Sequence, residues 1–362
     1  MNEEIPKEVL EAFTRYTPNL PARSAGKITS EILGGGLINN SYKISCESKD
    51  DFLLQRINKY VFTHPEHIQE NYINIWQFAE FEFTGLRLPF PIYFDRTTTL
   101  YVDDKENYWR AFEFIDEGKA LSIAEKPSQA KAAAAAFAKF TAAFNEFNVS
   151  SLKNSIPGFH DLSLRYSQFE QSLNTELHER RTKAQFVISE LKKRELYKHF
   201  FEVIIESDEF PQRVMHHDAK IANILFHKKT GKVICPVDFD TVMPGYYFSD
   251  LGDLIRSLAC NLDENSIDFE NIRIRKEFYE GIVDGYSQIM NPHFTKAEKK
   301  YLHAAGLLIL FMQSLRFITD YLNGDVYYKV QHPEQNLQRA RNQLTLLNHL
   351  EDFLKKEYNF SI

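Results

Sequence analysis

The chain has 362 residues, of which 43% are hydrophobic and 26% are charged, a balance typical of a folded protein and not of a disordered one. A formal net charge of −7 argues against non-specific nucleic-acid binding, which needs a basic surface. The three cysteines are scattered without a C-x-x-C pair, so they indicate neither a disulfide framework nor a zinc site. We find no early apolar segment and no run of about eighteen apolar residues, and therefore expect a cytoplasmic protein without a membrane span.

A glycine turn between two strands opens the predicted sheet. After an amphipathic helix at 6–16, the segment ITSEILGGGLINNSYKISC predicts two strands joined by Gly34, Gly35 and Gly36. Consecutive glycines let backbone amides close over phosphate groups without obstruction by side chains. The alternative is an ordinary hairpin, and only the residues further along the chain favour a loop that covers a nucleotide.

The next strand, at 52–58, has the apolar pattern of a buried central strand and carries Arg56. Arg56 is the candidate for gripping α- and β-phosphates, and a surface arginine at a strand end is the alternative. A helix opened by Pro65 follows. Glu66 and Glu70 lie off its apolar stripe, and we expect Glu70 to pair with Arg56, with a solvated position as the alternative.

A further hairpin at 99–103 and 108–115 ends the part of the chain that is rich in strands. We place the boundary between two lobes here, with a first lobe at 1–115 and a second at 116–362. The run around Phe112–Gly118, which includes Phe114, is where a kinase hinge would read adenine through its backbone.

The second lobe is predicted to be mainly helical. Phenylalanines recur along one face of a helix at 128–148, which is the pattern of a core stripe. The helical patterns lie at 128–148, 161–180, 182–206, 246–261, 268–289, 295–323 and 333–356. The fold class is therefore α+β, with a small antiparallel sheet followed by a helical lobe.

The segment VMHHDAKIANILF at 214–226 contains the spacing H-x-D-x-x-x-x-N, which is that of the catalytic loop of kinases. In this pattern Asp218 would orient the acceptor hydroxyl and take its proton. Asn223 and the later Asp238 would supply the hard oxygen ligands that Mg²⁺ prefers. A hairpin around a Lys-Lys-Thr-Gly turn at 228–231 separates them. The alternative is a polar turn with solvated acids.

Two neighbours of these residues are further candidates. Lys220, two positions after Asp218, could offset charge on the transferring phosphoryl group, or be a solvated lysine. Asp240 lies two positions after Asp238, so on a strand both carboxylates would face the same side. We expect Asp240 to touch the acceptor or to support the metal without binding it directly, with a structural hydrogen bond as the alternative, and we expect Asp250 to brace the catalytic loop.

Taken together, these residues resemble the aminoglycoside-phosphotransferase-like superfamily of small-molecule kinases. The segments at 53–71, 108–115, 216–226, 237–245 and 315–328 more narrowly resemble the N-acetylhexosamine 1-kinase branch. The resemblance implies a protein-kinase-like fold of two lobes, ATP and Mg²⁺ as cofactors, and a small-molecule sugar as acceptor. This sequence departs from the superfamily at Arg56, where many members have lysine, and at His217, where glycine is common.

The resemblance also suggests where the acceptor binds. The segment LRFITDYLNGDVYY offers polar groups and aromatic faces, and Arg316 and Tyr327 are the candidate acceptor-binding residues. A helix end with its Asn-Gly stop is the alternative. Two other functions stay open: a kinase of an amino alcohol or aminoglycoside, for which the acids at 263–270 give some support, and a nucleotide-binding regulator without turnover. We expect neither a nucleic-acid nor a membrane partner.

Overall fold

The computed structural model describes residues 5–16, 28–33, 38–46, 51–82, 84–174 and 176–362. These residues form two compact units. Unit 1 consists of Met1–Lys119, Glu146–Ile156 and Leu225–Met243, and unit 2 of Ala120–Asn145, Pro157–Ile224 and Pro244–Ile362. The division expected at 115/116 therefore missed two later segments that group with unit 1.

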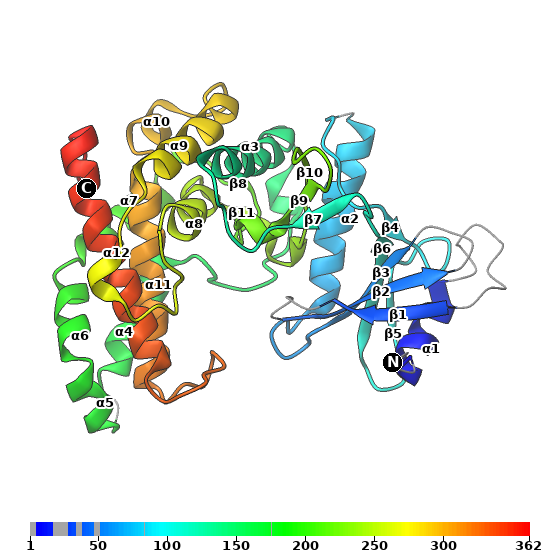
Figure 1. Cartoon of the computed structure of the whole chain (residues 1–362), viewed down its shortest axis with the longest axis horizontal. Coiled ribbons are helices and arrows are strands. Elements are labelled where there is room, and N and C mark those ends of the chain that lie inside the picture. Colours follow the sequence, from blue (N-terminus) through cyan, green and yellow to red (C-terminus); the bar gives the residue numbers. More distant parts are fainter. Residues whose placement is uncertain (1–4, 17–27, 34–37, 47–50, 83, 175) are drawn as a thin grey trace. The chain divides into compact units, whose positions relative to one another are not determined.

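Unit 1 is built on an antiparallel sheet in which the strands follow the order β1-β2-β3-β6-β4, with β5 also paired to β6 (Figure 1). The strands are β1 Ile28–Ile32, β2 Asn40–Cys46, β3 Phe52–Ile57, β4 Pro91–Ile92, β5 Leu100–Val102 and β6 Tyr108–Glu113. In the register, Arg56 lies opposite Trp109 and Gln55 lies opposite Arg110. Because side chains alternate along a strand, the first pair and the second pair lie on opposite faces of the sheet.

A helix packs on each face of this sheet. Helix α1, Lys7–Tyr16, contributes Phe13 and Tyr16 to a core that also contains Trp109. The Tyr16 hydroxyl donates a hydrogen bond to the carbonyl oxygen of Trp109 over 2.7 Å. Helix α2, Pro65–Phe81, places Tyr72 edge-on against Phe112, with 5.0 Å between ring centroids. Phe112 follows Trp109 by three residues in β6, so the two side chains point to opposite faces of the sheet. Helices α1 and α2 therefore cover opposite faces.

The hairpin predicted around the Lys-Lys-Thr-Gly turn is confirmed. Strands β9, Ile224–His227, and β10, Val233–Pro236, form a small sheet with β7, Gly118–Ala120, in the order β10-β9-β7. Gly231 in the connecting turn has φ +68°, a left-handed conformation that glycine adopts without a steric penalty. Pairing with β7 explains why 225–243 belongs to unit 1.

Unit 2 is mainly helical, as predicted (Figure 1). Its helices are α3 Pro127–Ala143, α4 Leu162–Ser172, α5 His178–Lys183, α6 Gln185–Lys192, α7 Leu196–Glu206, α8 Phe248–Leu258, α9 Lys276–Met290, α10 Lys296–Lys300, α11 Ala304–Leu322 and α12 Gln335–Tyr358. A short pair of strands joins them, β8 Arg213–Met215 and β11 Met243–Gly245. The predicted aromatic stripe of α3 is buried at Phe137, Phe140 and Phe144.

Helix α11 forms the centre of unit 2. Among the described helices, it alone is long and apolar enough to cross a membrane, with a mean hydropathy of 1.3 over its most apolar window. However, 83% of that window is buried inside the protein, which is the behaviour of a core helix. Helix α8 crosses it so closely that a Cβ on Gly252 would lie 2.4 Å from the carbonyl oxygen of Ala305.

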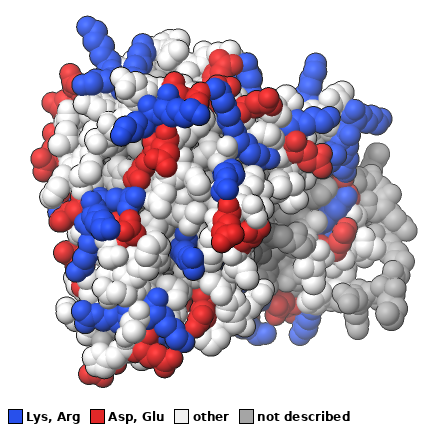
Figure 2. All heavy atoms as spheres, turned by 60° about the vertical axis from the view of Figure 1, so that its left-hand side comes forward, with Lys and Arg blue, Asp and Glu red and all other residues white. Residues whose placement is uncertain are grey.

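The surface carries charges of both signs. On the face that Figure 2 draws, lysine and arginine side chains are interspersed with aspartate and glutamate side chains. Nucleic-acid-binding surfaces are instead basic over a continuous area, so this face is not of that kind.

Candidate functional site

Asp250 of α8 holds the loop that carries Asp218 through hydrogen bonds to the loop backbone. The Asp250 carboxylate accepts the backbone N–H groups of His216 and His217 over 3.0 Å and 2.7 Å. Burial raises the pKa of Asp250 to about 7, although these two donors act in the opposite direction. His217 has φ +64°, a backbone conformation that favours glycine. This conformation gives a physical reason for the glycine that is common here in the superfamily that the sequence resembles.

Asp218 forms an ion pair and a hydrogen bond within its own loop. Its Oδ2 atom accepts Lys220 Nζ over 2.7 Å and Asn223 Nδ2 over 2.9 Å. Burial acts to raise the pKa of Asp218, but the charge of Lys220 and these two hydrogen bonds outweigh it and hold the pKa below its ordinary value. Asp218 is therefore ionised at neutral pH, and its side chain is 28% exposed, so a substrate can reach it.

Asn223 and Asp238 both offer oxygen atoms of the kind that Mg²⁺ prefers. Asn223 follows Asp218 in unit 2, at the end of a short 3₁₀ helix, Ile221–Asn223. Its Nδ2 donates to Asp218, which leaves its amide oxygen without a hydrogen bond in the described part of the chain. Asp238 belongs to unit 1, where it is exposed and has φ 66° and ψ 63° between β10 and the next 3₁₀ turn. An amide oxygen and a carboxylate are hard oxygen donors, which suits the expected Mg²⁺.

Asp240 does not have the role that the sequence suggested. It is buried, and its carboxylate pairs with Arg110 through Oδ1 and with Asn39 through Oδ2. Both oxygens are therefore engaged within unit 1 and neither is presented to an acceptor. The expectation failed because the backbone turns into the left-handed region at Asp238, so Asp238 and Asp240 do not share the face of a strand.

Arg110 was missed by the sequence analysis. It is 3% exposed, and its Nε donates to Gln55 Oε1 over 3.1 Å in addition to its pairing with Asp240. The available signal was an arginine flanked by Trp109 and Ala111 in the mainly apolar segment YWRAFEFI. A charge within a buried strand needs an internal partner, which here is a carboxylate far along the chain.

Arg56 pairs with Glu8 of α1, over 2.8 Å between Nη1 and Oε1, and not with Glu70. Its guanidinium also lies over the ring of Trp109, 5.7 Å from the centroid. These contacts place Arg56 on the face of the sheet that α1 covers. The expected pairing with Glu70 is therefore wrong, because sequence periodicity did not reveal that α1 packs on this face.

The remaining candidates for nucleotide binding are three glycines and two phenylalanines. Gly34, Gly35 and Gly36 are outside the described residues. Phe112 is buried against Tyr72. The backbone N–H of Phe114 donates to the carbonyl oxygen of Asp51 over 3.0 Å, so it is not open to adenine as a hinge donor would be.

The structure brings the two acceptor-binding candidates together in unit 2. Arg316 and Tyr327 line a cavity of about 360 Å³ between α4, α11 and the loop at 326–328. The Arg316 guanidinium lies 5.9 Å from the centroid of the Tyr327 ring. Asp320 holds the loop by accepting the N–H groups of Tyr327 and Tyr328 over 2.8 Å and 2.9 Å.

One layer of aromatic rings joins this cavity to the catalytic loop within unit 2. The ring of Phe159 lies under Arg316, with its centroid 4.9 Å from the guanidinium carbon. The rings of Phe159 and His160 lie 6.4 Å and 5.2 Å from that of His217, the neighbour of Asp218. Burial lowers the pKa of His160 well below its ordinary value, and His217 and Arg316 lower it further, so His160 is neutral.

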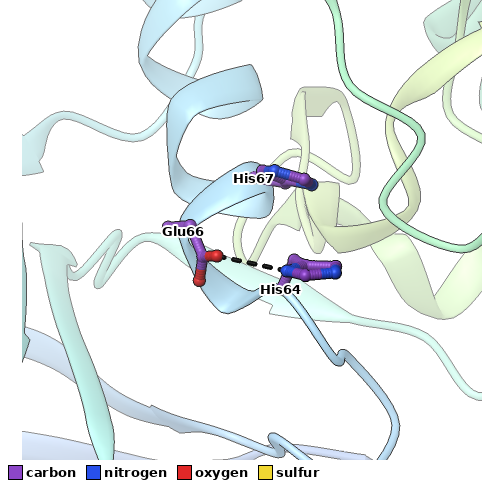
Figure 3. A group of neighbouring side chains, drawn as sticks. All are labelled: His64, Glu66 and His67. Carbon is purple, nitrogen blue, oxygen red and sulfur yellow. Dashed lines mark hydrogen bonds and ion pairs between the residues drawn. The ribbon is translucent and has the colours of Figure 1, made fainter.

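A second group of possible metal ligands lies at the start of α2. Figure 3 shows His64, Glu66 and His67, with His64 Nδ1 3.3 Å from Glu66 Oε1. The two imidazole rings are stacked, with centroids 4.8 Å apart and planes inclined by 25°. A metal binds in the plane of an imidazole, and these two planes meet only far beyond bonding distance of the ring nitrogens, so one ion cannot bind both rings as they lie. The segment His-Pro-Glu-His would have signalled the group.

Comparison with known proteins gave a family and a fold. The model of the phosphotransferase enzyme family matches residues 29–294. An aminoglycoside phosphotransferase from Alicyclobacillus acidocaldarius is similar with a TM-score of 0.62 and 13% identity, covering 98% of each chain. A choline kinase from Cryptosporidium parvum has a TM-score of 0.54 and 15% identity over 97% of each chain. An amicoumacin kinase in complex with AMP-PNP and Ca²⁺ has a TM-score of 0.55 and 13% identity over 87% of each chain. These likenesses confirm the predicted fold class.

Proposed function

The chain belongs to the phosphotransferase enzyme family, and on that premise we propose that it transfers the γ-phosphate of ATP to the anomeric hydroxyl of an N-acetylhexosamine. The observation that carries the proposal is the cavity lined by Arg316 and Tyr327 in unit 2. A sugar needs hydrogen-bond donors for its hydroxyl and acyl oxygens and an aromatic face for its ring, and this cavity offers both. The aromatic layer beneath it leads to the loop of Asp218.

Asp218 is the proposed general base. Its Oδ2 is held by Lys220 and Asn223, which fixes the orientation of the carboxylate. Its Oδ1 accepts no hydrogen bond among the described residues and is the atom to which the acceptor hydroxyl would give its proton. Lys220, which pairs with Asp218, is the proposed source of positive charge for the transferring phosphoryl group. General-base positioning of this kind contributes about 10²–10⁴-fold to a rate.

Asn223 and Asp238 are the proposed ligands of Mg²⁺, through the amide oxygen of the first and the carboxylate of the second. When bound, the ion neutralises charge on the phosphate groups of ATP. The likeness in fold to a kinase in complex with AMP-PNP and Ca²⁺ supports a nucleotide and a divalent cation as cofactors.

The charges around the cavity favour a sugar over a cationic acceptor. Its lining contains two arginines, Arg165 and Arg316, and one carboxylate, Asp320, which is engaged by backbone N–H groups. The acids at 263–270, which left a cationic acceptor open, give less support than expected. Glu264 among them already pairs with Arg256 and Arg339.

We also propose that the protein works in the cytoplasm and without nucleic-acid or membrane partners. Cys235 and Cys260 are free thiols and are buried, which agrees with a reducing compartment.

The test is an assay of ADP release with Mg²⁺-ATP and a panel of acceptors: N-acetylglucosamine, N-acetylgalactosamine, choline, aminopropanol and an aminoglycoside. We expect the highest kcat/KM with an N-acetylhexosamine. A preference for any of the cationic acceptors would overturn the assignment of the acceptor but leave the phosphotransferase family intact.

A further inference from the structure

Two arginines of the acceptor cavity lack a carboxylate partner. Arg165 of α4 donates from Nη1 to Gln168 Oε1 over 3.0 Å and from Nη2 to the carbonyl oxygen of Phe159 over 3.4 Å. Its Nε is buried and has no partner. Arg316 of α11 donates from Nη1 to Gln313 Oε1 over 3.3 Å. Within the described parts of the chain, neither guanidinium forms a salt bridge.

Three other arginines in unit 2 show how a carboxylate can compensate a partly buried guanidinium. Each has a carboxylate within hydrogen-bonding distance: Arg213 with Glu298 at 2.8 Å, Arg256 with Asp253 at 2.7 Å, and Arg194 with Glu351 at 2.9 Å. Such pairing offsets the cost of removing a charge from water. The arginines of the cavity have no such compensation.

The acids nearest to the cavity arginines are engaged elsewhere. Asp320 lines the same cavity, but it accepts two backbone N–H groups and also Asn336 Nδ2 over 2.9 Å. Asp161 caps α4 by accepting the N–H of Leu164 over 2.9 Å. Burial lowers the pKa of Arg165, and the positive charge of Arg316 lowers it further, which is the expected result of two uncompensated cations side by side.

We propose that Arg165 and Arg316 form a subsite for an anionic group on the acceptor, so that the preferred acceptor is an N-acetylhexosamine that carries a carboxylate or a phosphate. This proposal rests on the proposed function. A guanidinium binds either group through two parallel N–H donors, and the bonds are stronger than those between neutral groups. The Nε of Arg165 has no partner among the described residues and supplies a further donor.

The experiment compares kcat/KM for three acceptors that differ in one substituent: N-acetylglucosamine, N-acetylmuramic acid, which adds a carboxylate, and N-acetylglucosamine 6-phosphate, which adds a phosphate. We expect at least one acidic sugar to exceed the neutral sugar by about tenfold or more. The better of the two identifies the anion. Equal or lower kcat/KM for both acidic sugars would overturn the subsite.

Three variants assign the preference to a residue. Arg165→Gln should bring the ratio of acidic to neutral sugar near one, because the acidic sugars lose more kcat/KM than the neutral sugar. Arg165→Lys, which keeps the charge but loses the planar fork, should give an intermediate ratio. Gln171→Ala, on the same helix and in the same cavity lining, is the matched control and should keep the wild-type ratio. Equal losses for all three sugars in Arg165→Gln would contradict the proposal.

Two readouts separate this proposal from the function on which it rests. Raising the ionic strength should raise the KM of the acidic sugar in the wild type and much less in Arg165→Gln, because salt screens the attraction. Efficient turnover of neutral sugar without an acidic preference overturns the subsite alone. Turnover of choline or an aminoglycoside with none of any sugar overturns the proposed function and the subsite together.

Discussion

Two carboxylates of this protein have similar hydrogen-bonding partners but differ in their exposure to solvent. Each is bound by one cation and one asparagine amide: Asp218 by Lys220 and Asn223 in unit 2, and Asp240 by Arg110 and Asn39 in unit 1. The side chains of Asp218 and Lys220 are 28% and 34% exposed. Those of Asp240 and Arg110 are 5% and 3% exposed.

Burial decides what each group can do. The ion pair of Asp218 is reached by water, so it contributes little to folding and its carboxylate remains open to a substrate. The ion pair of Asp240 is sealed, so each charge depends on the other, and breaking the pair leaves a charge without a partner. A carboxylate held by one cation and one amide is therefore accessible to a substrate in one unit and suited to structural support in the other.

The comparison predicts the largest effect for Asp218→Asn. Turnover should fall by about 10²–10⁴-fold, because the amide cannot take the proton of the acceptor. The free energy of unfolding in urea and the affinity for Mg²⁺-ATP should stay close to those of the wild type. Near wild-type turnover would remove Asp218 from the role of general base.

Asp240→Asn should act on folding. We expect a loss of about 3–5 kcal/mol in the free energy of unfolding, since Arg110 is left as a buried, unpaired charge. Replacing both partners, as in Arg110→Met with Asp240→Leu, should recover much of that loss because no charge remains buried. If the single variant unfolds at the same urea concentration as the wild type, the buried pair is not structural.

Asn223→Ala and Asp238→Ala should weaken the Mg²⁺-dependent part of ATP binding by about tenfold or more. The loss should be larger for Asp238→Ala, which removes a charged ligand. Titration of ATP with and without Mg²⁺ measures this, and Asp240→Asn, corrected for its unfolded fraction, is the control that should keep the metal dependence. An unchanged dependence on Mg²⁺ in both alanine variants would contradict their assignment as ligands.

The smallest effect on folding is expected for Lys220→Met. Because its ion pair is exposed, the free energy of unfolding should change by less than about 1 kcal/mol. Arg110→Met, the matching change in unit 1, should cost several times more. Chemical denaturation of both variants checks the contrast, and equal losses would show that exposure does not separate the two ion pairs.

The sequence predicted most of the local structure. Apolar periodicity indicated the helical segments of unit 2, and the Lys-Lys-Thr-Gly turn indicated the β9–β10 hairpin. Two long-range arrangements were missed. The segment Leu225–Met243 joins unit 1 through pairing with β7, and Glu8 of α1 reaches Arg56 across a sheet face. Neither contact follows from local pattern, because both depend on which elements pack together.

The candidate site also has one part that could be predicted from the sequence and one part that could not. The cluster of Asp218, Lys220 and Asn223 lies within six consecutive residues, so its spacing alone placed these side chains together. The role of Asp240 could not be predicted, because it depends on the left-handed backbone at Asp238 and on Arg110, a residue 130 positions away in the sequence. Sequence reasoning was reliable within one loop and failed where a distant partner decided the environment.

The most direct test of the central claim identifies the product by phosphorus NMR after incubation with Mg²⁺-ATP and an N-acetylhexosamine. We predict a single new sugar phosphate whose phosphorus couples to the anomeric proton, and none when Asp218→Asn replaces the wild type. A phosphate on another hydroxyl, or an unphosphorylated sugar beside a phosphorylated amino alcohol in a mixed incubation, would contradict the account.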